Sequence, residues 1–521
     1  MKHFKLKTGL AAAFVASTAL VGQPASAQDS DTLVIARTLA VNSLDPSRAF
    51  CDTCQFYLTA VYETLVTLAP DNQSLVPNLA ESWEVNDDFT EFTFKLKDAT
   101  FADGSPVEAS DVAWTFNRLK NVQASPSFLM EGLVSAEAVD AKTIKFTVEA
   151  PNSEFLNKVS APYTGIINAE AAMAAGATDT AEDNAESWFL SNSAGSGPFT
   201  LESFSPDAEL RLAKNDAYWG EAPGFNEVVV TEIKDAVSQA QALETGQVDI
   251  AMQIDPDTAN SIRSPEIVTE VIPSYNFTYV GFIPAVDEVL TKEVRQALAL
   301  AIDYEGMIDF TVGGNGVKQA APIPNGFPGT ADLTPRSQDV EKAKQMLADA
   351  GVSDLKMVAG YPNDNAYGVD FNIMMQKVQQ DFSNVGVELE LKPLTWAVWR
   401  DELGSGEWPV TAIYYAPDYY GSGQYVAYFS MIEGYPWAGR AGRDKPELVV
   451  NPKEAELYAK ALAASGEEAD AVYAELGQEM MDDAIIIPLV SPNLVLAYRD
   501  DIEGVRYSAC CNLPLSEITR K

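Results

Sequence analysis

The chain has 521 residues, 47% of them hydrophobic, which is enough to bury two or three cores and is typical of a folded protein. Asp and Glu total 75 against 35 Lys and Arg, so the formal net charge is −40. A surface this acidic repels phosphate backbones and anionic lipid, which excludes nucleic-acid binding as the function. The simplest explanation of the acidic composition is solubility, and a more specific one is a preference for cationic ligands.

The first residues have the pattern of an export signal. Three lysines precede an apolar stretch over residues 9–22 that is too short to span a bilayer, and Ala25-Ser26-Ala27 is a small-x-small cleavage site. We therefore expect residues 1–27 to be a signal peptide that is removed. Because no cysteine follows the apolar stretch, we expect a soluble periplasmic product without a lipid anchor.

Histidine occurs once, as His3, inside the predicted signal. The exported chain would then contain no histidine, which excludes Ser-His and Cys-His nucleophiles and imidazole-based metal sites. Hydrolysis by paired carboxylates remains possible, so an exported hydrolase of that kind stays open as an alternative.

Taken in chain order, the pattern alternates strands and helices and contains no short repeat. Asp45-Pro46 marks a turn after the first strand, Ser110 can cap a helix, and Asp303 can cap or support another. The predicted strands cover residues 32–38, 89–97, 143–149, 199–204, 209–214, 227–233, 248–252, 355–361, 387–394, 484–490 and 494–500. The predicted helices cover residues 55–66, 111–121, part of 169–185, 236–245, a pair within 293–313, 339–350 and 370–384. This order predicts an α/β protein of more than one domain.

The four cysteines fall into two pairs, Cys51 with Cys54 near the start and Cys510 with Cys511 near the end. In an exported protein the disulfide is the default state, whereas two adjacent cysteines suit a zinc site poorly. We expect the two ends of the chain to meet, with Cys51 and Cys54 bridged to Cys510 and Cys511. Local bridges within each pair are the second possibility, and a redox or metal role is the third.

Several sequence blocks carry a resemblance to a known family. The stretch from AVYETL to ASDV follows the pattern Y-E-x-L, then P-x-L-A-x-S-W, then F-x-D-G-x-P-x-x-A-x-D-V. GSGPF, NDAYWG, ALETGQVD and VRQALALAID match four further blocks. In these blocks the chain resembles the family 5 extracytoplasmic solute-binding proteins of ABC importers, which include oligopeptide-, dipeptide- and nickel-binding members.

The resemblance implies a two-lobed periplasmic-binding-protein fold of type II with an extra domain, mixed sheets flanked by helices, and a hinged cleft that closes over the ligand. It implies domain I over residues 28–60, 195–278 and 487–521, domain II over residues 61–194, and domain III, the second lobe, over residues 279–486. It also implies a monomer that performs no chemistry, needs no cofactor or metal, and delivers a small-molecule or peptide ligand to permease subunits in the inner membrane. A sensor that presents its ligand to a receptor would use the same fold.

The same resemblance indicates which residues meet the ligand. Trp396 corresponds to the family's pocket tryptophan, and Asp418 falls where peptide-binding members place the aspartate that meets the ligand's α-ammonium. An aromatic is expected at Tyr415, with Tyr419 beside it, and Phe50 and Gln55 follow a turn that borders the cleft. The alternative is that Asp418 is a turn residue among core tyrosines and not a ligand contact.

One departure from the family concerns the ligand carboxylate. Dipeptide-binding members carry an arginine ahead of the helix predicted at residues 370–384, and here that stretch, GYPNDNAYGVDF, contains no basic residue. Asn363 and Tyr367, also expected in the site, would offer neutral hydrogen bonds instead. We expect a peptide or cationic amino compound as ligand, with an oligosaccharide or an opine-like solute as the alternative.

Overall fold

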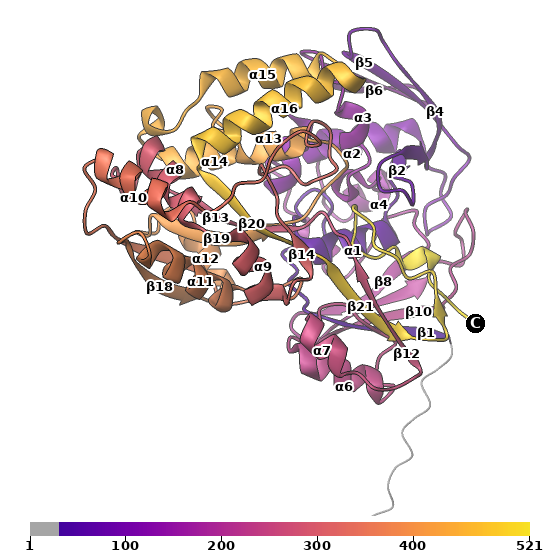
Figure 1. Cartoon of the computed structure of the whole chain (residues 1–521). Helices are drawn as coiled ribbons and strands as arrows, with labels where there is room; N and C mark the ends of the chain where they lie inside the picture. The colour runs from indigo at the N-terminus through magenta and orange to yellow at the C-terminus, as the bar shows by residue number, and fades with distance from the viewer. Residues whose placement is uncertain (1–30) are drawn as a thin grey trace, which may run out of the picture.

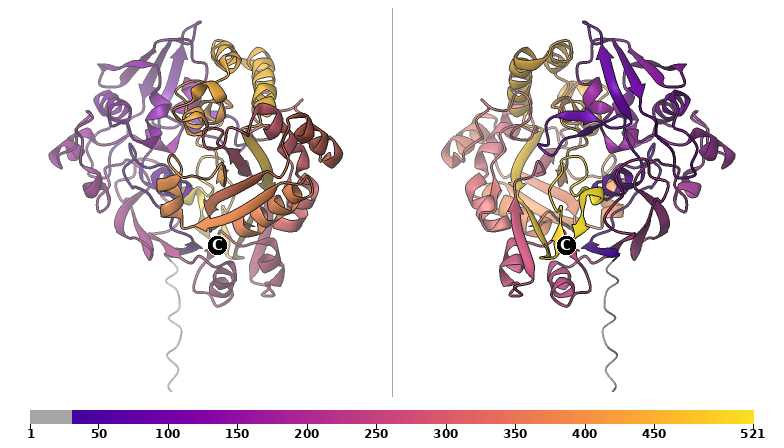
Figure 2. Two further views of the ribbon diagram at one scale, coloured as in Figure 1. Left: turned by 90° about the vertical axis from the view of Figure 1, so that its left-hand side faces the viewer. Right: turned by 90° about the vertical axis from the view of Figure 1, so that its right-hand side faces the viewer.

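The structure is a computed structural model that describes residues 31–521, so the predicted signal peptide lies outside the described residues. Three large sheets organise the chain into two lobes (Figures 1 and 2). We call the seven-stranded and four-stranded sheets with their helices the first lobe, and the six-stranded sheet with its helices the second lobe. Within residues 31–521, no helix combines the length and apolar character needed to cross a membrane.

The seven-stranded sheet of the first lobe is assembled from separated stretches of the chain. Its order is β12-β21-β11-β1-β10-β9-β8, and β1 pairs in parallel with β10 and with β11. Parallel partners need long connections, which leaves room for the other sheets to be inserted between these strands. The strands are β1 (Thr32–Arg37), β8 (Phe199–Ser205), β9 (Glu209–Lys214), β10 (Glu227–Glu232), β11 (Ile250–Ala251), β12 (Ile267–Ile272) and β21 (Leu494–Arg499).

A four-stranded antiparallel sheet, of order β4-β5-β7-β6, completes the first lobe. The alternation in β5 buries Phe92, Phe94 and Leu96 on one face, as a half-exposed strand requires. α2 packs against β6 and β7. The strands are β4 (Ala80–Val85), β5 (Glu91–Leu96), β6 (Leu133–Asp140) and β7 (Thr143–Val148), and the helices of the first lobe are α1 (Asp52–Val61), α2 (Ala109–Asn121), α3 (Phe155–Lys158), α4 (Ala169–Ala174), α5 (Glu186–Phe189), α6 (Ala236–Glu244) and α7 (Pro256–Ser261).

The second lobe is built on a six-stranded mixed sheet of order β14-β20-β13-β19-β15-β18. β13 is buried along its whole length because helices cover the sheet. The strands are β13 (Phe277–Phe282), β14 (Gly316–Val317), β15 (Lys356–Pro362), β18 (Glu388–Leu394), β19 (Val410–Tyr415) and β20 (Ile486–Pro492), and the helices are α8 (Lys292–Ala301), α9 (Tyr304–Val312), α10 (Val340–Asp349), α11 (Phe371–Ser383), α12 (Trp396–Glu402), α13 (Gly423–Phe429), α14 (Pro436–Gly442), α15 (Pro452–Leu462) and α16 (Gly466–Asp483).

The chain crosses between the lobes in two short segments. One lies between β12 and β13, at residues 273–276, and the other is Asn493, between β20 and β21. The first crossing lies just before the expected boundary at residue 278. The second lies beyond the expected boundary at residue 486, because β20 pairs within the six-stranded sheet of the second lobe.

Most predicted elements are present with shifted ends, and the structure also contains elements that were not predicted, among them α15 and α16. The helix predicted from residue 55 begins at Asp52, with Cys51 as its N-cap. Ser110 was predicted to cap α2, and this is wrong: the helix begins at Ala109, and the backbone N–H of Glu108 donates to Asp111 Oδ2 over 3.0 Å. This acid at the third helical position therefore satisfies the backbone N–H of the N-cap residue, as one half of a capping box.

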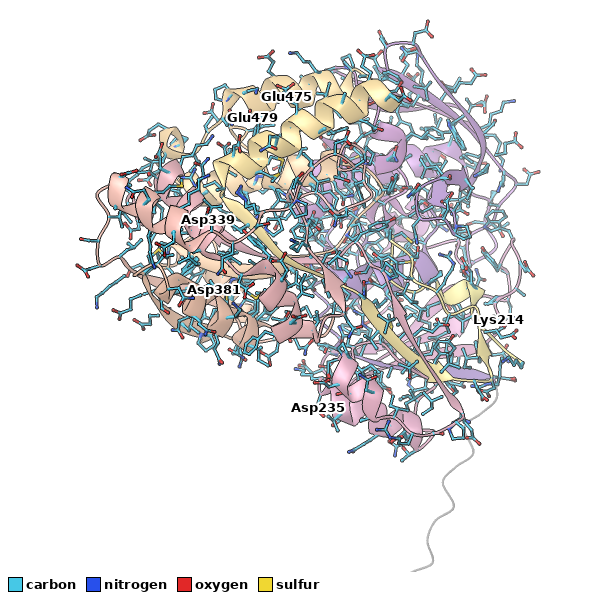
Figure 3. The ribbon with its side chains drawn as sticks, in the orientation of Figure 1. Lys214, Asp235, Asp339, Asp381, Glu475 and Glu479 are labelled. Carbon is cyan, nitrogen blue, oxygen red and sulfur yellow. A yellow bond between two sulfur atoms is a disulfide. The ribbon has the colours of Figure 1, made fainter. Side chains whose placement is uncertain are left out.

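Aspartate side chains begin several helices by accepting backbone N–H groups that the first turn leaves unpaired. Asp235 and Asp339, both labelled in Figure 3, cap α6 and α10 in this way, at 2.8 Å and 2.9 Å. Asp303 caps α9 through the N–H of Gly306 at 2.9 Å, which is the capping role expected of it.

Three of the family-like sequence blocks converge on the carboxylate of Glu63. Glu63 accepts hydrogen bonds from Ser196 Oγ at 3.0 Å, Tyr218 Oη at 2.9 Å and Trp219 Nε1 at 2.6 Å. These donors come from GSGPF and NDAYWG, and Glu63 comes from Y-E-x-L. Burial raises the pKa of Glu63 to about 7, against the lowering effect of its three donors. The three sequence blocks are therefore joined to one another within the first lobe through hydrogen bonds to Glu63.

Replacing Glu63 should destabilise the first lobe. Glu63→Ala leaves three donors without an acceptor and should cost roughly 3 kcal/mol or more, whereas Glu63→Gln keeps the shape and should cost roughly 1–2 kcal/mol. Because the folded-state pKa lies above the usual value, the stability contributed by Glu63 is complete below about 4.5 and is lost as pH rises to about 7. Urea unfolding followed by tryptophan fluorescence at several pH values measures both effects.

The exposed Glu221→Gln is the matched control and should leave the unfolding midpoint and its pH dependence unchanged. An unfolding curve of Glu63→Ala that coincides with the wild-type curve would show that the three hydrogen bonds contribute nothing.

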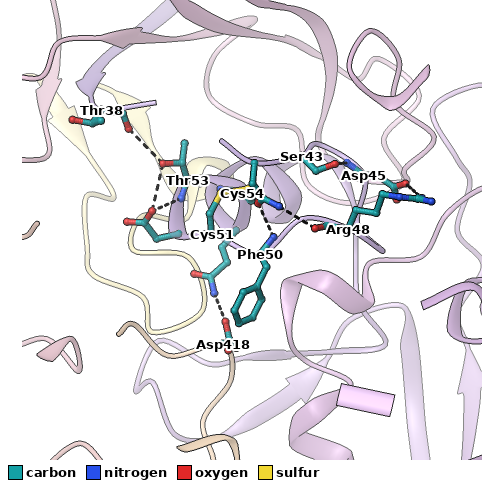
Figure 4. Close-up of a disulfide and its surroundings, with 12 residues drawn as sticks. Thr38, Ser43, Asp45, Arg48, Phe50, Cys51, Thr53, Cys54 and Asp418 are labelled. Carbon is teal, nitrogen blue, oxygen red and sulfur yellow. Dashed lines mark hydrogen bonds and ion pairs between the residues drawn. A yellow bond between two sulfur atoms is a disulfide. The ribbon is translucent and has the colours of Figure 1, made fainter. Parts of the chain in front are cut away.

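A disulfide closes the first turn of α1. Cys51 is bonded to Cys54, and Cys51 Sγ also accepts the backbone N–H of Cys54 at 3.0 Å (Figure 4). Cys510 and Cys511 are free thiols with their sulfur atoms 2.8 Å apart. The predicted cross-link between the two ends of the chain is therefore wrong, because the helical turn brings Cys54 back to Cys51. So short a loop stabilises by roughly 2 kcal/mol in the chain-entropy model, less than a link between the termini would.

The ends of the chain nevertheless meet, through non-covalent contacts. The backbone N–H of Ala509 donates to Asn72 Oδ1 at 2.9 Å, and Arg520 forms an ion pair with Asp249 at 2.9 Å. Arg520 Nη2 also reaches the carbonyl of Thr32, in β1, at 3.5 Å. The contact from Arg520 to Thr32 thus joins the two ends, and the other two contacts tie the last residues to more interior parts of the chain.

Peptide mapping without a reducing agent tests the cysteine pairing. Trypsin should release residues 49–95, which hold Cys51 and Cys54, and residues 507–520, which hold Cys510 and Cys511, as two separate peptides. The first peptide should be lighter by two hydrogens than its reduced form, as mass spectrometry will show. A single joined species that separates only on reduction would contradict the local pairing.

Candidate ligand cavity between the lobes

A cavity of about 1080 Å³ lies between the two lobes. Its volume is at the upper end of the range for small-molecule sites, which leaves room for a ligand of several residues. One wall comes from the first lobe, around Phe50 and the start of α1. The opposite wall comes from the second lobe and includes residues of β13, β19, α12, α13 and α14. The site can form only when the two lobes face each other.

Asp418 is the most buried carboxylate of this cavity, with 3% of its surface exposed. Tyr415 Oη donates to its Oδ2 at 3.0 Å, and Gln55 Nε2 donates to its Oδ1 at 2.9 Å. Burial raises the pKa of Asp418 to about 7, although hydrogen bonds from Tyr415, Tyr163 and Gln55 act to lower it. Asp418 is thus held by neutral donors, and no cation of the described chain pairs with it.

The main chain around Asp418 is also fixed. Its backbone N–H donates to Gln424 Oε1 at 2.7 Å, at the start of α13, and Gln55 Nε2 reaches the carbonyl of Pro417 at 3.2 Å. Gln55 therefore binds both the side chain and the main chain of the facing lobe. Figure 4 shows Asp418 close to the first turn of α1 and its disulfide.

The turn ahead of α1 is anchored by a buried ionic network. Arg118, from α2, binds both oxygens of Asp45 at 2.6 Å and both oxygens of Asp183 at 3.0 Å and 3.2 Å. Arg48 joins the same two acids at 2.9 Å and 2.7 Å. This network and the disulfide position Phe50, whose ring lies 5.8 Å from Phe128 in the cavity wall.

Tryptophans cover one side of the cavity. Trp396 is the first residue of α12, where Thr395 caps the helix, and its ring lies 5.3 Å from that of Trp399. Trp399 is buried and donates its indole N–H to Thr411 Oγ1 at 2.9 Å, which holds the pair in place. Such rings provide flat apolar surface at the wall of a small-solute site.

Six of the eight residues expected at the ligand line this cavity: Phe50, Gln55, Asn363, Trp396, Tyr415 and Asp418. Asn363 is exposed at the rim and accepts a hydrogen bond from Asn372. Whether any of them touches a ligand stays a prediction.

Tyr367 and Tyr419 do not reach the cavity lining, although both were expected there. Tyr367 donates to Asp52 Oδ2 at 2.7 Å, and Tyr419 lies 3.4 Å from Glu154 Oε2. Glu154 also accepts the backbone N–H of Gly423 at 2.8 Å. Both tyrosines belong to the second lobe and both acids to the first, so these side chains join the lobes instead of facing the cavity.

The lining residues that sequence reasoning missed include Tyr163, Tyr428 and Arg440. Tyr163 lies in a short 3₁₀ segment of the first lobe, and Arg440 lies in α14, neither of which was predicted as an element. No local pattern distinguishes them, because they reach the cavity only through the packing of distant segments. Among residues 31–521, no cluster of three or more potential metal ligands is present.

Comparisons with known proteins agree with this architecture. The chain is 27% identical over 489 residues to the probable D,D-dipeptide-binding periplasmic protein DdpA of Escherichia coli K12, covering 92% of each chain. A periplasmic binding protein, DppA of Helicobacter pylori in complex with the peptide STSA, superposes with a TM-score of 0.82 at 21% identity, covering 94% of this chain and 98% of that one.

A third relative shows that one fold accommodates different solutes. The protein AgaA from A. tumefaciens R10, solved with agropinic acid, superposes with a TM-score of 0.80 at 21% identity, covering 94% and 99% of the two chains. The predicted two-lobed periplasmic-binding-protein fold is confirmed by these likenesses. The family model described as bacterial extracellular solute-binding proteins, family 5, middle region, matches residues 74–433. That match spans more than half of the sequence, and the chain therefore belongs to family 5 of the bacterial extracellular solute-binding proteins.

Proposed function

We propose that this protein captures a small solute with a cationic amino group, a short peptide in the first instance, and delivers it to an ABC importer. The observation that carries the proposal is Asp418, a carboxylate buried in the cavity wall with neutral donors and no cation beside it. An ammonium group of a ligand would supply the missing positive charge in a site largely closed to water, where such a pair is strong.

The charges around the cavity support a cationic ligand. Six acidic side chains line it, namely Asp52, Asp207, Glu232, Asp364, Asp401 and Asp418, against three basic ones, Lys234, Arg400 and Arg440. Asp52 is already paired with Arg37 at 3.3 Å, but Asp418 is not paired with a base. The excess of acids would attract a cation toward the cleft and lower the cost of burying it.

The family and the named relatives support the setting of this function. The probable D,D-dipeptide-binding relative is a periplasmic protein by its name, and we infer that this protein also works in the periplasm, as a monomer that docks on inner-membrane permease subunits. We infer that the solute leaves the site chemically unchanged, because the proposed role of the lobes is to enclose and release it.

A ligand panel tests the proposal. Purified protein should be stabilised against heat by di- and tripeptides with a free amino group, and far less by their N-acetylated forms or by oligosaccharides. Asp418→Asn should weaken binding of the best peptide by at least tenfold, because the charge partner of the ammonium is gone. The exposed Asp332→Asn is the matched control and should bind like the wild type.

Stabilisation by sugars alone would reject a cationic ligand, and recovery of a hydrolysed peptide from the incubation would reject a transport role. Binding of acetylated and free peptides with equal affinity would show that Asp418 is not the ammonium site.

The pH dependence of binding follows from the raised pKa of Asp418. A ligand ammonium needs the ionised carboxylate, which is fully present only above about pH 7. Affinity should therefore fall by up to roughly tenfold per pH unit below 7 and should level off above it, until the ligand amine itself loses its proton near pH 8. Calorimetry at pH 6 in two buffers of different ionisation enthalpy should detect release of a proton on binding, and a pH-independent affinity between 5 and 7 would contradict this assignment.

A further inference from the structure

Arg440 is another charged side chain in the cavity wall without an ion-pair partner among the described residues. It lies in the last turn of α14 and lines the cavity. Its guanidinium lies over two aromatic rings, 5.1 Å from the centre of Tyr428 and 5.7 Å from the centre of Trp437. Within residues 31–521 its charged or ionisable neighbours are tyrosines, and no carboxylate forms an ion pair with it.

The hydrogen-bonding capacity of Arg440 is incomplete. Its Nη1 is buried and has no hydrogen-bond partner among the described residues. A buried donor without an acceptor is costly, and more so when it carries charge. Stacking on two rings and a hydrogen bond with Tyr428 stabilise the cation in part, but they supply no acceptor for Nη1. An anion entering the cavity would provide one.

The other two basic residues of the cavity differ from Arg440. Lys234 is 69% exposed and lies 3.4 Å from Glu232, and Arg400 is exposed at the rim on α12. Exposed bases bind anions weakly because water and salt screen them. Arg440 is the basic group of the lining that is both partly buried and fixed in orientation by its neighbours.

Arg440 and Asp418 lie on the same wall of the second lobe. Tyr415, which donates to Asp418, has its ring 4.7 Å from that of Tyr428, and Tyr428 lies under the Arg440 guanidinium. Two tyrosines in ring contact thus separate the acid from the base. Their opposite charges face one cavity from two places, which suits a molecule that carries both charges at a distance.

We propose that Arg440 binds a carboxylate of the solute whose ammonium group lies at Asp418. This assignment rests on the proposed function and extends it, since it makes the ligand a zwitterion with separated charges and not a simple amine. A guanidinium fork matches the two oxygens of a carboxylate, which a lysine or a neutral amide would do less well. The stretch at residues 361–371, which has no basic residue, then needs none, because the anion is held from α14.

Paired ligands test the assignment. The probe is the tightest-binding peptide of the di- and tripeptide panel, compared by calorimetry with the same peptide as its C-terminal amide. Wild-type protein should bind the free acid at least tenfold more tightly than the amide. Arg440→Gln should bring this ratio close to one, and Arg440→Lys should leave an intermediate ratio because the charge remains and the fork is lost. Arg263→Gln, an exposed residue, is the matched control and should keep the wild-type ratio.

The affinities for the free acid and the amide are compared on the same variant. A general loss of affinity therefore leaves their ratio unchanged. If Arg440→Gln does not fold, the Arg440→Lys ratio decides. Three results would each overturn the assignment. They are equal affinities of the wild type for the free acid and the amide, an unchanged wild-type preference for the free acid in Arg440→Gln, and loss of that preference in Arg400→Gln. So would tightest binding of an amine that has no anionic group. Failure of every peptide, acid or amide, to bind the wild type would reject the proposed function itself.

Discussion

A carboxylate buried without a cation is the feature on which the site depends. Asp418 keeps its place because donors from both lobes reach it, Tyr415 from its own lobe and Gln55 from the other. Neutral donors offset part of the cost of burial but leave the charge uncompensated. The same arrangement that makes the buried charge costly is the reason for proposing a cationic solute as the group that would complete it.

Hydrogen bonds between polar groups form part of the contact between the lobes. Tyr367 with Asp52, Gly423 with Glu154, and Gln55 with Asp418 are hydrogen bonds whose groups can return to water when the lobes part. Only short segments, at residues 273–276 and at Asn493, connect the lobes covalently. Polar contacts of this kind favour reversible closure, which a protein that must both capture and release its solute requires.

The interior of the first lobe is held by networks of buried charged and hydrogen-bonded side chains. In the first lobe the Glu63 carboxylate gathers three donors, and Arg118 bridges Asp45 and Asp183 in the interior. These networks fix the turn and the helix start from which Phe50 and Gln55 extend. The disulfide adds a covalent restraint to the same turn. A stiff first wall lets the second lobe find one closed position, which reduces the entropy lost when a ligand binds.

The sequence by itself determined the alternation of strands and helices and the family resemblance, and through that resemblance it indicated Phe50, Gln55, Trp396 and Asp418, which line the cavity. Local periodicity and turn chemistry decide the alternation of elements, because they depend on residues a few positions apart. Only the tertiary structure decided that Cys51 bonds to Cys54, that Tyr367 and Tyr419 bind acids of the other lobe, and that Arg440 lies in the cavity wall. Those outcomes depend on which distant segments become neighbours when the sheets assemble, and no spacing along the chain records the direction in which a side chain then points.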